Sequence, residues 1–341
     1  MKHICFSIVM LLLSTAVWAQ APLKIIASAS MFEDMTENLI TDEFTVQSIV
    51  PVGGDPHKYK AKPSDARNVQ QADLVLVNGL TFEGWITELI ENSGTKAKIV
   101  TITEGIDVIG SLQYENSSDP HAWMSATNGL IYIENIKNAL IELRPSSKEA
   151  IEANYETYKA KLVKLDQDIE VEIKKIPVDQ RVLITSHDAF QYFGDRYNVR
   201  LEAIMGISTE AQAQTSDIIR VTKVIQENKV PAVFIESTIN PKMLQQIAKD
   251  NKVKIGGELY ADSLGDEEGS GSTYIDMLWH NTSTIVDALS QKLPLQENSE
   301  SENKESVPSL TDGLTTTSKI VLASILVLAM LSVLLFKLKK P

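Results

Sequence analysis

The stretch from Ser146 to Ile176, SSKEAIEANYETYKAKLVKLDQDIEVEIKKI, decides the architecture of the chain. It contains no glycine and no proline, and its apolar residues recur at spacings of two to four, which indicates one face of an amphipathic helix. Pro145 lies just before this stretch and Pro177 ends it. A helix of about thirty residues would be roughly 45 Å long, far beyond the usual globular length. We expect a rigid connector between two lobes, because a coiled-coil arm would need a second segment of this kind.

Short apolar runs alternate with amphipathic stretches on both sides of this helix. Strands are predicted at residues 23–27, 44–50, 74–77, 98–102, 181–185, 201–204, 232–235 and 252–256. Helices are predicted at residues 31–40, 82–92, 214–227 and 241–249. Alternation of this kind predicts parallel sheets with helices on both faces. The expected fold class is α/β, with two lobes whose parallel sheets are flanked by helices and which are joined by one long backbone helix.

The N-terminus has the pattern of an export signal. Lys2 precedes a largely apolar run, and residues 17–19, VWA, place small residues at the two positions that signal peptidase reads. We expect a signal peptide over residues 1–19, with an uncleaved anchor as the alternative. The only cysteine, Cys5, lies inside this segment. The mature chain therefore has neither a disulfide nor a thiolate ligand, and any metal site must use histidine and carboxylate.

The C-terminal region carries a second membrane signal. An uncharged apolar run from Ile320 to Phe336 is flanked by lysines on both sides. At about 1.5 Å per residue it is near the lower limit of length for spanning a bilayer. The terminal lysines favour a cytoplasmic tail and argue against the alternative of a GPI signal. Residues 296–318 are rich in Ser, Thr, Glu and Asn, a composition typical of an extended tether.

These observations divide the 341 residues into seven segments. They are a signal peptide (1–19), an N-terminal α/β lobe (20–144), a connecting helix (145–177), a C-terminal α/β lobe (178–294), a tether (295–318), a transmembrane helix (319–337) and a tail (338–341). The formal net charge of −13 excludes a typical nucleic-acid-binding surface, because phosphates attract basic proteins. An acidic surface is compatible with cation handling but does not establish it.

Three histidines lie in contexts that suit ligand binding. His57 lies in GGDPHKY, His121 in DPHAWM and His187 in SHDAFQYF. His57 and His187 lie where predicted strands end, and His121 lies in the loop before a long amphipathic segment. In open α/β sheets ligands collect at the carboxyl ends of the strands, and all three histidines lie at loop positions of that kind. His57 and His121 both follow an Asp-Pro pair, whose proline restricts the backbone. We expect the preceding Asp55 and Asp119 to hydrogen-bond locally or to orient the imidazole rings.

Together with ADSL at residues 261–264, these motifs resemble the zinc and manganese solute-binding proteins of bacterial ABC importers, which have the TroA-like fold. The similarity covers about residues 23 to 290 and keeps the order of the family's motifs. The resemblance implies two α/β lobes on one long helix, and a cognate ABC permease with its ATPase as partners. It implies four metal ligands: His57, His121, His187 and Asp262. Other matching segments add Glu210 and Glu236, which we predict, with Asp55 and Asp119, to support the ligands or line the pocket.

The predicted ligand set suits one transported ion, either Zn²⁺ or Mn²⁺. Three imidazoles and one carboxylate satisfy tetrahedral zinc, whereas a bidentate Asp262 would supply the additional oxygen that manganese prefers. Nitrogen-rich ligation favours zinc. However, zinc-specific members of the resembled family often carry a histidine-rich loop, and residues 110–119 contain no histidine. The choice between the two metals therefore stays open.

We predict metal capture and handover rather than catalysis. The expected protein is a monomer on the periplasmic or extracellular side, anchored to the cytoplasmic membrane by its C-terminal helix, with two ligands from each lobe. A surface adhesin is one alternative. A zinc hydrolase is another, although the sequence contains neither His-Glu-x-x-His nor Gly-x-Ser-x-Gly.

Overall fold

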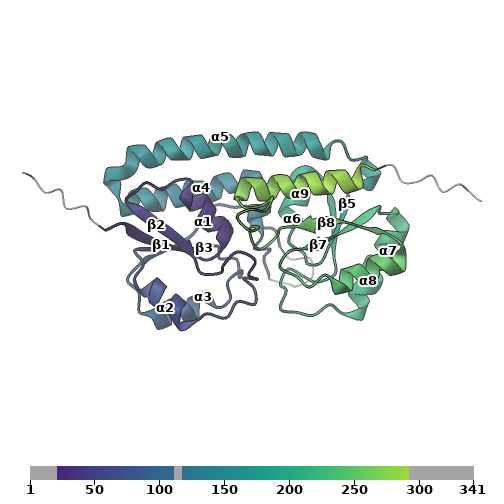
Figure 1. The fold of residues 1–341 in the computed structure, drawn as a ribbon, viewed down its shortest axis with the longest axis horizontal. Helices are drawn as coiled ribbons and strands as arrows, with labels where there is room; N and C mark the ends of the chain where they lie inside the picture. Colours follow the sequence, from purple (N-terminus) through teal and green to yellow (C-terminus); the bar gives the residue numbers. More distant parts are fainter. Residues whose placement is uncertain (1–20, 111–116, 292–341) are drawn as a thin grey trace, which may run out of the picture. The chain divides into compact units, whose positions relative to one another are not determined.

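The first half of the chain forms a four-stranded parallel sheet in the order β2-β1-β3-β4 in the computed structural model (Figure 1). Its strands are β1 (Leu23–Ala27), β2 (Phe44–Ser48), β3 (Leu74–Val77) and β4 (Lys98–Thr101). The structure describes residues 21–110 and 117–291. The predicted signal peptide, tether, transmembrane helix and tail therefore lie outside the described residues, as do the last three residues, 292–294, of the predicted C-terminal lobe.

Helices cover both faces of this sheet. They are α1 (Ser30–Glu37), α2 (Pro63–Gln70), α3 (Ile86–Ser93) and α4 (Ala126–Leu143). Every residue of β3 is buried, as expected for a parallel strand between two helical layers. Leu74 and Leu76 join the core that contains α1 and α4. Val75 and Val77 point to the opposite face and pack with α2 and α3. The alternation of side chains along one strand thus fills two cores.

The second half contains two parallel strand pairs, β5 with β6 and β7 with β8, and β5 lies beside β7. The strands are β5 (Val182–Thr185), β6 (Arg200–Ala203), β7 (Ala232–Glu236) and β8 (Lys254–Leu259). The helices are α6 (Gln191–Tyr197), α7 (Thr215–Asn228), α8 (Lys242–Asn251) and α9 (Tyr274–Leu289). Apolar residues of α7 and α8 pack on one face of β5 and β7, and α9 packs against β8.

Helix α5 (Lys148–Ile173) links the two halves. It has 26 residues, follows a 3₁₀ turn at Pro145–Ser147, and runs beside α4 and α9 (Figure 1). Its inward residue Leu162 belongs to one apolar core that also contains Phe32 from the first half and Leu278 from the second. The predicted α/β class with one long helix is confirmed. Because a single core joins the halves, their separation would expose apolar surface.

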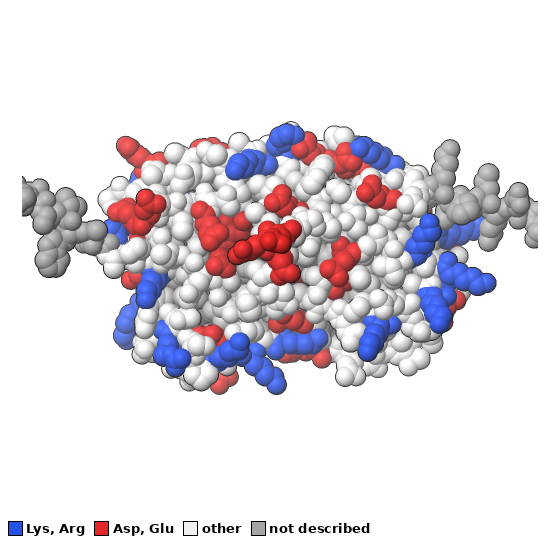
Figure 2. All heavy atoms as spheres, viewed as in Figure 1, with Lys and Arg blue, Asp and Glu red and all other residues white. Residues whose placement is uncertain are grey.

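The surface is acidic over the middle of the face drawn in Figure 2, with Lys and Arg side chains nearer its margins. This distribution agrees with the formal net charge of −13. Across residues 21–110 and 117–291, no helix combines the length and the apolar character needed to cross a membrane.

Candidate metal centre

The structure brings four of the predicted site residues into one buried cluster. His57 follows β2, His121 follows β4, His187 directly follows β5 and Asp262 follows β8, so each side chain stands beyond the carboxyl end of a strand. One potential ligand atom from each residue lies within 4.8 Å of all the others. The first two come from the first half of the chain and the last two from the second. The site is therefore formed between the halves.

His121 is oriented by the aspartate of its own motif. The Asp119 Oδ1 accepts hydrogen bonds from the His121 backbone N–H at 2.9 Å and from its ring Nδ1 at 2.7 Å. Both side chains are fully buried. With Nδ1 committed as a donor, the lone pair of the neutral ring is at Nε2, which lies 3.4 Å from Asp262 Oδ1. The Asp-Pro-His motif therefore presents Nε2 to the cluster.

His187 is oriented by a carboxylate that is distant in sequence. Glu236, at the end of β7, accepts from the backbone N–H groups of Ser186 at 2.8 Å and His187 at 2.9 Å. Its second oxygen lies 2.5 Å from His187 Nδ1. Nε2 again points inward, 3.2 Å from Asp262 Oδ2. Glu236 and Asp119 thus have the same relation to their histidines, although only Asp119 is local.

His57 is held mainly through its backbone. Its N–H donates to Asp55 Oδ1 at 3.0 Å, and the other Asp55 oxygen accepts from the Thr209 hydroxyl at 2.7 Å. The ring packs against Phe82 in a T-shaped arrangement with a centroid distance of 5.1 Å. Its Nε2 lies 3.2 Å from His121 Nε2. His57 is also the most exposed of the four residues, at 8%. The Asp55–Thr209 contact fastens its loop to the second half of the chain.

Asp262 is the acceptor on which the imidazoles converge. Its residue is 1% exposed, and neither carboxylate oxygen has a hydrogen-bond donor among the residues that the structure describes. The Nε2 atoms of the three histidines lie 3.2 to 3.8 Å from these oxygens. A buried carboxylate without donors is costly unless a cation neutralises it. Three inward ring nitrogens and this carboxylate form a donor set that fits a divalent metal ion.

The electrostatics favour an anionic carboxylate beside a neutral imidazole. Burial lowers the pKa of His57 to about 3, so this ring is neutral at physiological pH. Burial acts to raise the pKa of Asp262, but the histidines, His187 foremost, outweigh it and hold the pKa below its usual value. For His187, burial lowers the pKa, and the carboxylates of Glu236 and Asp262 outweigh that effect and raise it well above normal. In the metal-free protein a protonated His187 thus supplies positive charge beside Asp262, and a metal ion at this site would displace that proton.

A second polar network supports the His121 loop, and no sequence motif predicts it. The fully buried Glu83 accepts from Ser28 Oγ at 2.5 Å and from the backbone N–H of Asn78 at 2.7 Å. Asn78 in turn donates through Nδ2 to the carbonyl of Pro120 at 3.0 Å. Burial raises the Glu83 pKa, and these hydrogen bonds act against it. The proline next to His121 is therefore fixed by residues about forty positions earlier.

Glu210 lies apart from the cluster. Its side chain is exposed and borders a surface depression of about 280 Å³, which is also lined by His57 and Pro120. The depression is the open approach to His57. Glu210 therefore lines the approach to His57, whereas His121, His187 and Asp262 do not line this depression. Its functional role stays a prediction.

With this geometry established, the chain can be compared with known proteins. The family described as "Zinc-uptake complex component A periplasmic", ZnuA, matches residues 25–288. The chain belongs to this family. It is similar to the manganese-binding lipoprotein MntA of Halalkalibacterium halodurans, with 35% identity covering 85% of this chain and all of the relative. The manganese ABC transporter substrate-binding lipoprotein PsaA of Streptococcus anginosus is also 35% identical, covering 79% of this chain and 90% of the relative.

Solved structures extend the similarity to the fold. The periplasmic zinc-binding protein TroA of Treponema pallidum matches with a TM-score of 0.75 and 31% identity, covering 80% of this chain and 100% of TroA. A manganese-bound periplasmic metal-binding protein from Candidatus Liberibacter asiaticus matches with a TM-score of 0.73 and 32% identity, covering 78% and 99%. The predicted family is confirmed. The ZnuA family is one of transport receptors and not of enzymes, and nothing in these similarities supports an adhesin or a hydrolase.

Proposed function

We propose that this ZnuA-family protein captures one Zn²⁺ or Mn²⁺ ion outside the cytoplasm and delivers it to the permease of an ABC importer for uptake. The proposed ligands are His57, His121, His187 and Asp262. The observation that carries the proposal is the unpartnered Asp262 carboxylate, buried where three imidazole Nε2 atoms converge. The permease and its ATPase are the proposed partners, as in other ABC import systems.

The arrangement suits reversible capture. Two ligands come from each half of the chain, so a bound ion links the halves, and release requires a conformation with poorer ligand geometry. No ligand position is reserved for a water nucleophile, because the four protein donors by themselves satisfy tetrahedral zinc. Asp119 and Glu236 fix the ring tautomers of His121 and His187 and make them better ligands. These features favour binding and handover over hydrolysis.

Both metals fit the donor set. The two oxygens of Asp262 face different imidazoles, with Oδ1 nearer to His121 and Oδ2 nearer to His187. Coordination through one oxygen gives the four-coordinate site that zinc prefers, and coordination through both gives the higher number that manganese accepts. The named relatives include one zinc-binding and several manganese-binding proteins. We therefore propose Zn²⁺ or Mn²⁺ without choosing between them.

We further propose that the protein is exported by residues 1–19 and held at the outer face of the cytoplasmic membrane by residues 319–337. The similar MntA and PsaA are named lipoproteins, whereas the only cysteine here is Cys5, within the export signal. The apolar run that ends at Phe336 would supply the attachment instead. Attachment of a monomer through the 295–318 tether would raise its effective concentration at the permease.

Metal analysis and competition between zinc and manganese test the proposal. Full-length protein purified without chelator should contain about one equivalent of metal, as read by elemental analysis. His57→Ala and His187→Ala should lose the metal but keep the wild-type circular dichroism spectrum, whereas His280→Ala, which changes a histidine outside the cluster, should keep both. Full metal content in the His57 and His187 variants would refute the proposed ligands.

A further inference from the structure

A tryptophan joins the segments that carry two of the proposed ligands. Trp123 lies in the turn Ala122–Met124, directly after His121, in the first half of the chain. Its indole Nε1–H donates to the carbonyl of Ala261, in the second half, at 2.9 Å. Ala261 directly precedes Asp262. One hydrogen bond therefore links the residue two positions after His121 to the residue just before Asp262.

The indole of Trp123 is held in place by the core around it. Trp123 is fully buried, and its ring centroid lies 4.6 Å from that of Phe82 and 5.6 Å from that of Phe32. Its carbonyl accepts a hydrogen bond from the Tyr274 hydroxyl at 2.5 Å. The imidazole of His121 meets the same indole in a T-shaped arrangement at 5.3 Å. Contacts from several elements thus fix the direction of the indole N–H.

The position of Asp262 depends on the backbone on either side of it. Its carboxylate receives no hydrogen bond within the described part of the chain, so no donor orients the side chain. On one side, the Ala261 carbonyl accepts from Trp123. On the other, the Ser263 hydroxyl accepts from the Gly53 N–H at 2.7 Å. Both donors belong to the first half of the chain, which also carries two of the proposed histidine ligands, and they therefore fix the carboxylate relative to those imidazoles.

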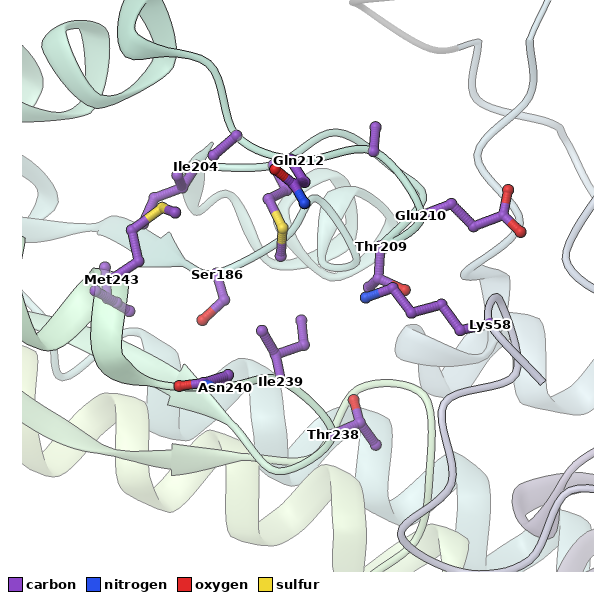
Figure 3. Close-up of a pocket in the computed structure, with 14 residues that line it drawn as sticks. Lys58, Ser186, Ile204, Thr209, Glu210, Gln212, Thr238, Ile239, Asn240 and Met243 are labelled. Carbon is purple, nitrogen blue, oxygen red and sulfur yellow. The ribbon is translucent and has the colours of Figure 1, made fainter. Parts of the chain in front are cut away.

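The Trp123 hydrogen bond is better shielded from water than the link between Thr209 and Asp55. Thr209 and Lys58 line one open pocket of about 340 Å³ (Figure 3), so the hydrogen bond from Thr209 to Asp55 borders solvent. Neither Trp123 nor Ala261 lines this pocket, and both residues are fully buried. A hydrogen bond is electrostatically stronger in the protein interior than in water. The Trp123 bond is therefore the stronger constraint on the geometry of the site.

We propose that Trp123 is a positioning residue for Asp262, whose carboxylate it holds at the place that metal coordination requires. The indole N–H acts through the Ala261 carbonyl and does not touch the ion. The inference rests on the proposed function, because Asp262 is a proposed metal ligand. Ligands that are held in place before binding lose less conformational freedom on binding, and most of the resulting gain in affinity is a slower release. Loss of the N–H should therefore displace the carboxylate and speed the release of metal.

The test compares Trp123→Phe with the wild type as full-length proteins loaded with Co²⁺ alone. Phenylalanine removes the N–H donor and keeps an aromatic ring in the core. The visible absorption of bound Co²⁺ depends on coordination geometry, so its bands should change in position or intensity in the variant. Transfer of Co²⁺ to excess chelator should be about three- to tenfold faster, as expected from one lost hydrogen bond. Trp279→Phe, which changes a tryptophan that is 40% exposed on α9, is the matched control and should behave as the wild type.

A second variant separates the hydrogen bond from the packing of the ring. Benzothienylalanine at position 123 replaces the indole N–H by sulfur and keeps both fused rings, so it leaves almost no cavity. It should show the same change in the Co²⁺ bands and the same faster release. Wild-type bands and release rate in this variant would overturn the positioning role, even where Trp123→Phe is unstable or unfolded. A wild type that bound neither Co²⁺ nor Zn²⁺ would instead refute the proposed function, and this inference with it.

Discussion

Glu236→Gln tests how the ring of His187 is fixed in the metal centre. Glu236 accepts two backbone N–H groups on one oxygen and the His187 Nδ1–H on the other. A glutamine has one acceptor oxygen and one donor NH₂ group. If the oxygen stays on the two backbone groups, the NH₂ faces Nδ1 and forces the ring into the tautomer that carries its proton on Nε2. If the amide turns, its NH₂ faces two N–H donors. Either arrangement removes a good ligand or leaves donors unpaired.

The expected loss follows from this geometry. Changes in groups that orient a metal-bound histidine weaken metal binding by about 10- to 100-fold. This range corresponds to about 1.4 to 2.7 kcal/mol of binding free energy. We expect the upper part of the range, because the substitution removes both the preferred tautomer and the negative charge of a buried carboxylate. The same loss should occur for zinc and manganese, since Glu236 acts on the ring and not on the ion.

Competition with a chelating fluorescent indicator measures the dissociation constants of wild type and variant for each metal. Glu258→Gln is the matched control, because it makes the same chemical change on an exposed residue of the neighbouring strand β8. Circular dichroism and the melting temperature of the metal-free proteins separate a folding defect from a binding defect. A correctly folded Glu236→Gln protein with less than about a threefold loss of affinity would refute the orienting role assigned to this carboxylate.

Three further predictions concern other parts of the molecule. His57→Ala should weaken metal binding by more than about 100-fold, beyond the effect of a supporting residue, whereas calorimetry should find His280→Ala unchanged. Asp55→Asn should weaken it only about fivefold, because Asp55 holds the backbone and not the ring; an effect as large as that of Glu236→Gln in the same calorimetric assay would contradict this ranking. Burial raises the Asp34 pKa, so the folded state binds the proton more tightly than the unfolded state, and the wild type loses stability as the pH rises from about 4 through the raised value. In urea unfolding experiments with chelator present, the free energy of unfolding of Asp34→Asn should rise relative to that of the wild type across that pH window. A difference between the two proteins that does not change with pH would contradict the raised pKa of Asp34.

The long helix and the apolar strands could be predicted from the sequence, whereas two of the short helices could not. The long helix was visible because its apolar stripe extends over many turns, and the observed α5 lies within the predicted stretch. The strand β3 was visible because all its residues are apolar. Helices α2 and α6, of eight and seven residues, were not predicted, although α1 and α3, which have eight residues each, were. Helix α2 also begins at Pro63, which in sequence reads equally well as a turn.

For the candidate site, local motifs were predictable and distant pairings were not. The Asp-Pro-His motif places Asp119 two residues before His121, and that spacing alone suggests the hydrogen bond that the structure shows. His187 and Glu236 are 49 residues apart, and only the neighbouring positions of β5 and β7 bring them together. The support of Pro120 by Asn78 has the same origin. Such contacts depend on strand order, which periodicity does not determine.

The three imidazoles are restrained to different degrees, and this difference locates the accessible side of the site. His121 and His187 are fully buried, and a carboxylate fixes the Nδ1 of each ring. His57 is fixed by its backbone N–H and by a T-shaped contact with Phe82, and it is the only one of the four residues that borders the surface depression. Its loop is fastened to the second half through Asp55 and Thr209. A metal ion that enters or leaves the site passes the most accessible ligand. Entry and release of the ion are therefore least hindered at His57.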